Sequence, residues 1–247
     1  MKKTLTLLLI CLSAGIHLVK AQNWGGGVDE QRFNWGYSFQ YVSAEYKIWK
    51  NPNWKLPRVD ENFVNIKDTL SSIKSNPTPG FAIGFVANLN INNNLDLRST
   101  PSLAFSERRI DYGYYPILNS PSPPVSQKVQ ATMIELPLSL KLKSDRLGNF
   151  RAYMLGGIKY SMDIASRKKN NNAEILNEVE KKINNQKMFL SYEAGAGMDF
   201  YFSFFKMSTE LKLSRSFKDI LVHENTIYAS PIEKAKLRHF TFSLFFE

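Results

Sequence analysis

Apolar and polar residues alternate along several stretches of this chain, most plainly in residues 35–41. Trp35, Tyr37, Phe39 and Tyr41 occupy every second position, and small or polar residues lie between them. Because successive side chains of a strand point to opposite faces, this pattern predicts a β-strand with one apolar and one polar face. A chain built of such stretches is expected to be all-β.

Eight stretches share this alternation. Each is long enough, when tilted, to cross the hydrocarbon layer of a membrane. The predicted strands cover approximately residues 34–46, 81–89, 95–105, 134–142, 150–165, 192–200, 205–213 and 240–246.

The connections between these strands alternate between short and long. The short ones are Asn92–Asn94, Ser144–Asn149 and Ser203–Phe204, and the long ones are Lys47–Pro79, Glu107–Lys128, Arg167–Lys187 and Lys218–Lys236. Short periplasmic turns and long outer loops are typical of outer-membrane barrels. We therefore predict a single eight-stranded antiparallel transmembrane outer-membrane β-barrel with four long extracellular loops. A soluble sandwich or lipocalin-like barrel also alternates, but it does not explain an aromatic-rich face that continues to the end of the sequence.

The N-terminal residues predict export. Lys2 and Lys3 precede an apolar run, and a small-x-small site predicts cleavage between Ala21 and Gln22. The apolar run is too short for a spanning helix. We expect a signal peptide at 1–21, a periplasmic tail at 22–33 and the barrel at 34–247, in the outer membrane of a Gram-negative bacterium. Cys11, the single cysteine, lies in the predicted signal, so neither disulfide nor thiol chemistry is expected.

The formal net charge is +10, and the predicted signal contributes three of these positive charges through its lysines. Nucleic acid is not an expected partner, because no basic run is interleaved with aromatic residues and the chain is exported. Anionic lipid head groups of the outer membrane or an acidic partner account for the charge better.

Charged residues at inward positions define the predicted barrel interior. An eight-stranded barrel has room for side chains but not for an aqueous channel, so these charges are expected to pair with one another as a structural plug. A proton or ion relay through the plug is the alternative interpretation. The predicted interior residues are Arg98, Glu135, Lys141, Lys159, Asp163, Glu193, Asp199, Glu210 and Lys212.

Two prolines and two glycines predict local irregularities in the strands. Pro101 and Pro137 each remove a ladder hydrogen bond, which usually signals an edge or a bulge. At Gly156 and Gly157 the outward phase of the strand is expected to shift, from Tyr153 and Leu155 to Ile158, Tyr160 and Met162, through a bulge or kink.

The third long loop contains a predicted helix at Ala173–Asn184. Leu176, Val179 and Ile183 recur at helical spacing after an asparagine cap. This apolar stripe is expected either to rest on the barrel rim or to dock a partner helix.

Catalytic, metal and cofactor sites are not expected. After the predicted signal the histidines are His223 and His239, and no serine in a glycine-flanked elbow accompanies them. No phosphate loop or metal-ligand spacing occurs, so no small-molecule substrate is expected.

Several segments resemble the PorT-like outer-membrane barrel family. The central ones are Ile134–Lys141 and Arg151–Tyr160, and further similarity covers Leu97–Leu103, Ser214–Phe217 and Tyr228–Ile232. The resemblance implies an accessory barrel of the type IX secretion system, acting through protein–protein contacts and in some bacteria supporting gliding. It implies no catalytic residues. A small structural or adhesive barrel like OmpA or OmpX is the alternative, and a lipid-modifying enzyme is a weaker one. Glu247 departs from the aromatic residue that usually ends such barrels.

Overall fold

The computed structural model describes residues 31–56, 58–59, 65–67, 69–115, 124–164 and 181–247. The predicted signal peptide and its cleavage site, most of the predicted tail, and most of the predicted third-loop helix lie outside these residues. The described end of that helix, residues 181–184, is not helical. Within the described part of the chain no helix is long and apolar enough to span a membrane.

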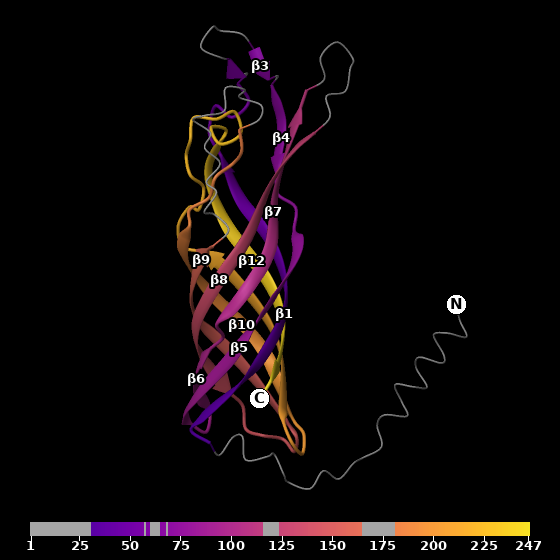
Figure 1. The fold of residues 1–247 in the computed structure, drawn as a ribbon, viewed down its shortest axis with the longest axis vertical. Helices are drawn as coiled ribbons and strands as arrows, with labels where there is room; N and C mark the ends of the chain where they lie inside the picture. The colour runs from indigo at the N-terminus through magenta and orange to yellow at the C-terminus, as the bar shows by residue number, and fades with distance from the viewer. Residues whose placement is uncertain (1–30, 57, 60–64, 68, 116–123, 165–180) are drawn as a thin grey trace, which may run out of the picture.

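Long strands dominate the chain and form an elongated barrel (Figure 1). The barrel strands are β1 (Phe33–Lys50), β5 (Thr78–Asn92), β6 (Leu95–Ser99), β7 (Ser102–Tyr114), β8 (Val125–Lys143), β9 (Phe150–Asp163), β10 (Met188–Tyr201), β11 (Lys206–Ser216) and β12 (Ile232–Phe246). Three short strands lie between β1 and β5, namely β2 (Arg58–Val59), β3 (Asn65–Lys67) and β4 (Leu70–Lys74).

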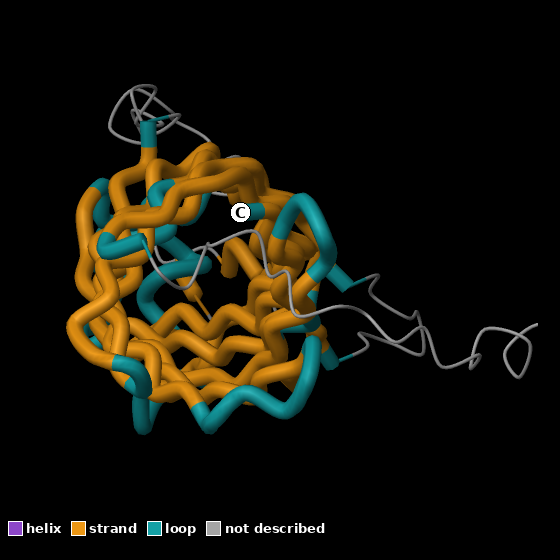
Figure 2. Tube along the Cα trace, turned by 90° about the horizontal axis from the view of Figure 1, so that it is seen from below, coloured by secondary structure: helices purple, strands orange, loops and turns teal. Residues whose placement is uncertain are grey.

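Antiparallel pairing closes the sheet into a ring. The order runs β1, β12, β11, β10, β9, β8, then β6 with β7, then β5, and β5 pairs again with β1. Seen from below, the strands surround a single interior (Figure 2). Because β6 and β7 continue one another, the ring has eight crossings, which confirms the predicted eight-stranded barrel. Closure leaves no open edge among the crossings.

The two ends of the barrel differ. Short turns join β5 to β6, β8 to β9 and β10 to β11, and Glu247 lies at this same lower end, which we name the turn end (Figure 1). The longer connections lie at the opposite end, which we name the loop end. The short turns match the predicted ones at Asn92–Asn94, Ser144–Asn149 and Ser203–Phe204.

Several strands extend further toward the loop end than predicted. The prediction of a long second loop at Glu107–Lys128 is wrong in its bounds, because β7 and β8 remain paired up to Tyr112 and Val125. β12 likewise begins at Ile232, inside the predicted fourth loop. Outward residues of these extensions, such as Glu107, are polar because they lie beyond the apolar belt. Their polarity suggested a loop, whereas the hydrogen-bonded ladder continues.

The third crossing is interrupted at Thr100 and Pro101, between β6 and β7. Pro137 lies inside β8 at the position where the neighbouring strand changes from β7 to β6. The register of β8 with β9 runs through Pro137 without a shift. The missing amide hydrogen therefore lies where the ladder is already interrupted, and the hydroxyl of Ser99 donates to the carbonyl of Pro137 at 2.8 Å.

The predicted bulge at Gly156 and Gly157 is wrong. β9 keeps an unshifted register with both β8 and β10. Tyr153 and Leu155, which the sequence suggested to be outward, are buried inside the barrel. The prediction failed because it assigned the aromatic Tyr153 to the outer face. The side chain of Tyr153 lies in the interior, so the alternation runs through Gly156 and Gly157 without a change of phase.

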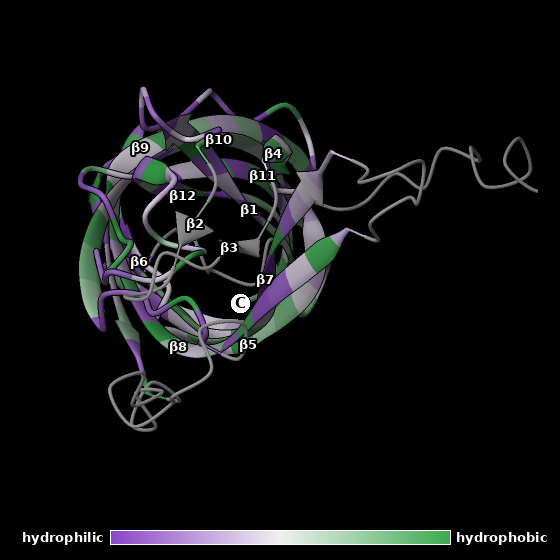
Figure 3. Ribbon diagram, turned by 90° about the horizontal axis from the view of Figure 1, so that it is seen from above, coloured by the Kyte–Doolittle hydropathy of each residue, from purple (hydrophilic) through white to green (hydrophobic). Residues whose placement is uncertain are grey.

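Alternation divides each strand into an outer and an inner face, visible as bands of contrasting hydropathy (Figure 3). The outer face carries an apolar belt that includes Trp35, Phe85, Leu140, Leu211 and Phe242, all exposed. In the interior, charged residues occupy the part toward the turn end. The alternation had suggested an interior that is polar throughout. Instead, an apolar cluster fills the part toward the loop end.

Candidate functional site

The described interior of the barrel contains many buried charged side chains. Each of the predicted interior residues (Arg98, Glu135, Lys141, Lys159, Asp163, Glu193, Asp199, Glu210 and Lys212) is buried. They come from five strands, β6, β8, β9, β10 and β11, because alternation places every second side chain of each strand inside.

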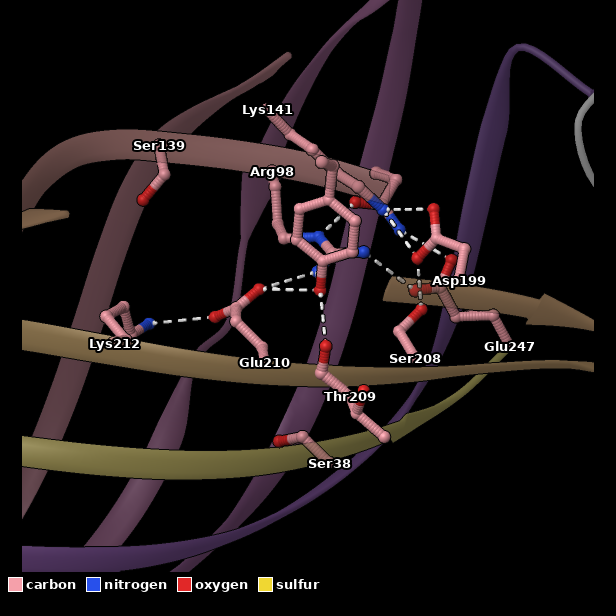
Figure 4. Close-up of polar contacts among 12 residues, drawn as sticks. Ser38, Arg98, Ser139, Lys141, Asp199, Ser208, Thr209, Glu210, Lys212 and Glu247 are labelled. Atoms are coloured by element: carbon pink, nitrogen blue, oxygen red, sulfur yellow. Dashed lines mark hydrogen bonds and ion pairs between the residues drawn. The ribbon is translucent and has the colours of Figure 1, made fainter. Parts of the chain in front are cut away.

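Arg98 joins four strands near the turn end (Figure 4). Its guanidinium forms ion pairs with Glu210 at 3.0 Å and with Glu247 at 3.1 Å, and it donates to Asn88 Oδ1 at 2.7 Å. The Tyr153 hydroxyl donates to Glu210 at 3.0 Å. The planar donor set of arginine serves several acceptors at once, so this buried charge is fully surrounded by partners.

Lys141 and Asp199 form the most enclosed pair of the interior (Figure 4). The Lys141 ammonium lies 2.9 and 2.7 Å from the two carboxylate oxygens of Asp199. The hydroxyl of Ser208 donates to the same carboxylate at 2.6 Å, and the ammonium also lies 3.8 Å from the centre of the Tyr153 ring.

A second group of charges lies further along the interior. The Lys159 ammonium contacts Glu135 at 2.8 Å and His239 Nδ1 at 3.3 Å. Lys212 lies 3.4 Å from Glu193 and 3.6 Å from Glu210, which links this group to Arg98. The interior charges thus form contacts across several strands rather than isolated pairs.

Sequence reasoning missed several interior charges. Asp96 pairs with Lys143 at 2.7 Å, and Lys206 pairs with Glu247 at 2.5 Å. The same inward phase would have found Asp96, Lys143 and Lys206 on their strands. Glu247 follows Phe246 in the alternation and turns inward, which accounts for a charged residue after the last aromatic one. Nothing in its local sequence indicates its partners.

Arg108 is also fully buried, beyond the paired charges toward the loop end. One guanidinium nitrogen lies 2.6 Å from the sulfur of Met133, and the group lies 5.9 Å from the centre of the Phe189 ring. Its Nε has no hydrogen-bond partner among the described residues. Arg108 was missed because it falls in the segment predicted as the second loop.

The apolar cluster closes the interior at the loop end. Ile220, Leu221, Ile227 and Tyr228, from the connection between β11 and β12, are buried there with residues of the strands. The hydroxyl of Tyr112 donates to the carbonyl of Tyr228 at 2.8 Å. Burial raises the pKa of the Tyr228 hydroxyl above its ordinary value. We name this connection, residues 217–231, the cap segment.

Backbone contacts fix the cap segment to a neighbouring connection. The Gln186 amide donates to the carbonyl of Ile220 at 2.7 Å, and the Val222 amide donates to that of Asn184 at 2.9 Å. Asp219 accepts hydrogen bonds from two backbone amides, those of Leu221 and Ala235. The cap segment is therefore held by hydrogen bonds as well as by apolar burial.

The two histidines considered for catalysis lie in different surroundings. His223 is exposed on the cap segment and lies 2.7 Å from Asp219, whose other oxygen binds the backbone. His239 is buried against Lys159 and Glu135. Among the described residues, no group of three or more His, Cys, Asp or Glu side chains is arranged to hold a metal ion.

Solved structures of outer-membrane barrels are similar to this chain. OprG from Pseudomonas aeruginosa has 10% identity and a TM-score of 0.41, over 87% of this chain and 92% of that one. Neisserial surface protein A has 7% identity and a TM-score of 0.39, over 87% and 98%. AlkL has 10% identity and a TM-score of 0.37, over 94% and 92%. No curated protein sequence matches the chain significantly.

A family model for the outer membrane protein beta-barrel domain matches residues 20–222. The match covers most of the chain, including the strands that supply Arg98, Lys141 and Asp199. The closed ring, the lipid-facing apolar belt and the filled interior agree with it. The chain belongs to the outer membrane protein beta-barrel domain family.

Proposed function

We propose that this outer-membrane barrel is an accessory component of type IX protein secretion and acts through protein contacts at its loop end, not as an open pore. The filled interior is the observation that supports action through protein contacts and not as an open pore. Paired charges occupy the turn-end part, and the apolar cluster with the cap segment occupies the rest. A continuous water path has no room in a barrel of this size.

The secretion role is supported by the resemblance of Ile134–Lys141 and Arg151–Tyr160 to PorT-like barrels. Structurally, these segments lie side by side in β8 and β9, where Glu135 and Lys159 contribute to the interior charges. The resemblance thus falls on residues that hold the barrel interior together. The surface left for partners is the loop end, which we assign to the cell exterior because short turns of such barrels face the periplasm.

A deletion strain tests the secretion role. Loss of the gene should leave type IX cargo unexported, and plasmid-borne wild-type protein should restore export. Normal export in the deletion strain would contradict the proposal and favour a small structural or adhesive barrel. Loss of lipid or peptide turnover on changing His223, with export intact, would instead indicate an enzyme.

Planar-bilayer recording tests the absence of a pore independently of secretion. The purified barrel should give no steady conductance, because paired charges and the apolar cluster fill the described part of its interior. Steady single-channel conductance from the folded protein would refute the filled interior. An OmpF-type porin in the same bilayer serves as the positive control for insertion.

A further inference from the structure

Two like-charged pairs stand directly opposite each other on the outward face of neighbouring strands. Arg215 of β11 is the cross-strand partner of Arg238 of β12, and Lys47 of β1 is the partner of Lys236 of β12. All four alternate with buried residues and therefore point away from the barrel. We name these four residues the rim patch.

This arrangement is unfavourable without an anion. Side chains directly opposite across strands are about 5 Å apart at Cβ, and like charges there are destabilising. Glu45 of β1 stands opposite Arg238 and contacts it. Among the described residues neither Lys47 nor Lys236 has an ion-pair partner, and the buried Nε of Arg215 has no hydrogen-bond acceptor. Positive charge on the rim patch exceeds the negative charge that the described residues place beside it.

The two arginines of the rim patch lie at the loop-end edge of the apolar belt, and Lys47 and Lys236 lie one outward position further toward the loop end. The next outward residue toward the turn end is Leu213 on β11 and Phe240 on β12, and both are exposed. The Arg215 guanidinium lies 5.4 Å from the centre of the Trp49 ring, on the side away from the belt. Long cationic side chains at such an edge lie along apolar surface and carry their charge to the head-group level.

A third like-charged pair, outside the rim patch, shows what distinguishes the patch. Arg109 of β7 stands opposite Lys128 of β8. Arg109 contacts Asp111 at 2.6 Å, and Lys128 lies 3.5 Å from Glu107. Glu107 also separates this pair from the apolar Phe105 along β7. Each of these cations has its own carboxylate and neither adjoins the belt.

We propose that the rim patch binds the phosphate of a lipid head group in the outer leaflet, with the acyl chains lying against the belt below Leu213 and Phe240. Arginine presents paired donors that match phosphate oxygens, and the lysines add charge. The bound anion relieves the repulsion within both like-charged pairs. This proposal does not depend on the secretion role.

The test compares two double variants in phosphatidylcholine nanodiscs with or without diphosphoryl lipid A. R215Q/K236Q removes one cation from each pair of the patch and leaves Arg238 with Glu45. R109Q/K128Q is the matched control. Bound lipid A is counted by native mass spectrometry, and thermal unfolding is followed in the same samples. Wild type and control should bind lipid A equally, and R215Q/K236Q should bind about 25-fold more weakly, about fivefold for each cation removed.

The stability of R215Q/K236Q relative to wild type, measured with and without lipid A, separates loss of lipid binding from general destabilisation. In phosphatidylcholine alone, R215Q/K236Q should be at least as stable as wild type, because repulsion is removed. Lipid A should raise the unfolding temperature of wild type and control more than that of R215Q/K236Q. If that variant fails to fold, K47Q/K236Q replaces it with the same expectation. Equal lipid A affinity of wild type and patch variant would overturn the proposal. It would also be overturned if inorganic phosphate raised the unfolding temperature of the wild type as much as lipid A does.

Discussion

The Lys141–Asp199 pair gives the sharpest test of the filled interior. The ammonium lies 2.9 and 2.7 Å from the carboxylate oxygens, and the two side chains are 0% and 1% exposed. At an effective dielectric constant of about 20, two charges at this separation attract by about 6 kcal/mol. K141M removes this attraction and leaves Asp199 with the hydroxyl of Ser208 as its described hydrogen-bond donor.

The expected loss of unfolding free energy for K141M is about 3–5 kcal/mol, the usual cost of leaving a buried charge without its partner. The double variant K141M/D199N should be more stable than K141M by about 2 kcal/mol or more, because the uncompensated carboxylate is gone and the Ser208 contact persists. The double variant should therefore lose much less unfolding free energy than the sum of the losses of K141M and D199N, which is a large coupling between the two residues.

Urea unfolding in lipid vesicles measures these changes through tryptophan fluorescence, since Trp35 leaves the lipid on unfolding. K128M is the surface control. Lys128 is 57% exposed and 3.5 Å from Glu107, so its loss should cost at most about 1 kcal/mol. Additive destabilisation of K141M and D199N, or a K141M effect as small as that of K128M, would refute the reasoning that this charge is enclosed and needs its partner.

Three further variants probe the rest of the barrel. Y112F removes the hydrogen bond to the Tyr228 carbonyl and should cost about 1 kcal/mol, with faster amide exchange in the cap segment; unchanged exchange would contradict its anchoring role. G197V places a side chain where a Cβ would overlap both the Tyr153 ring and the backbone carbonyl of Thr209, so urea unfolding should show a loss of about 1–3 kcal/mol, and wild-type stability would show that the ring and the neighbouring strand β11 can both move aside. D219A removes the acceptor of two backbone amides, so limited proteolysis should cut the cap segment of D219A faster than that of H223A, which keeps both hydrogen bonds. Equal cleavage rates in the two variants would show that the Asp219–His223 ion pair, and not the backbone hydrogen bonds, protects the cap segment.

Much of the barrel was predictable from local sequence. Trp35 to Tyr41 alternate without a break, and the same two-residue period assigns faces on each crossing. The short turns follow from polar residues between apolar stretches. The inward phase also selects Arg98, Lys141 and Asp199 as interior residues. These inferences succeed because a strand side chain can take only two directions, so position along the strand decides its environment.

Other features depended on contacts between distant residues. Polarity at Glu107 and Arg109 suggested a loop, because sequence alone does not show where the membrane ends and the paired strands continue. Tyr153 appeared outward because it is aromatic, yet it fills the interior between charges. The prolines illustrate both cases: the break at Pro101 was predictable, but the continuous register at Pro137 depends on β6 and β7 beside it.

Local sequence was enough to predict an all-β chain with eight membrane-length crossings, an outward apolar face and an inward charged one. The folded barrel was needed to show which charges meet, that the cap segment fills the loop end, and that one outer face gathers Arg215, Arg238, Lys47 and Lys236. These two sets of features differ because they depend on interactions of different range. Alternation is a property of neighbouring residues, whereas ion pairing and cross-strand repulsion depend on the register between strands, and closure of the ring sets that register.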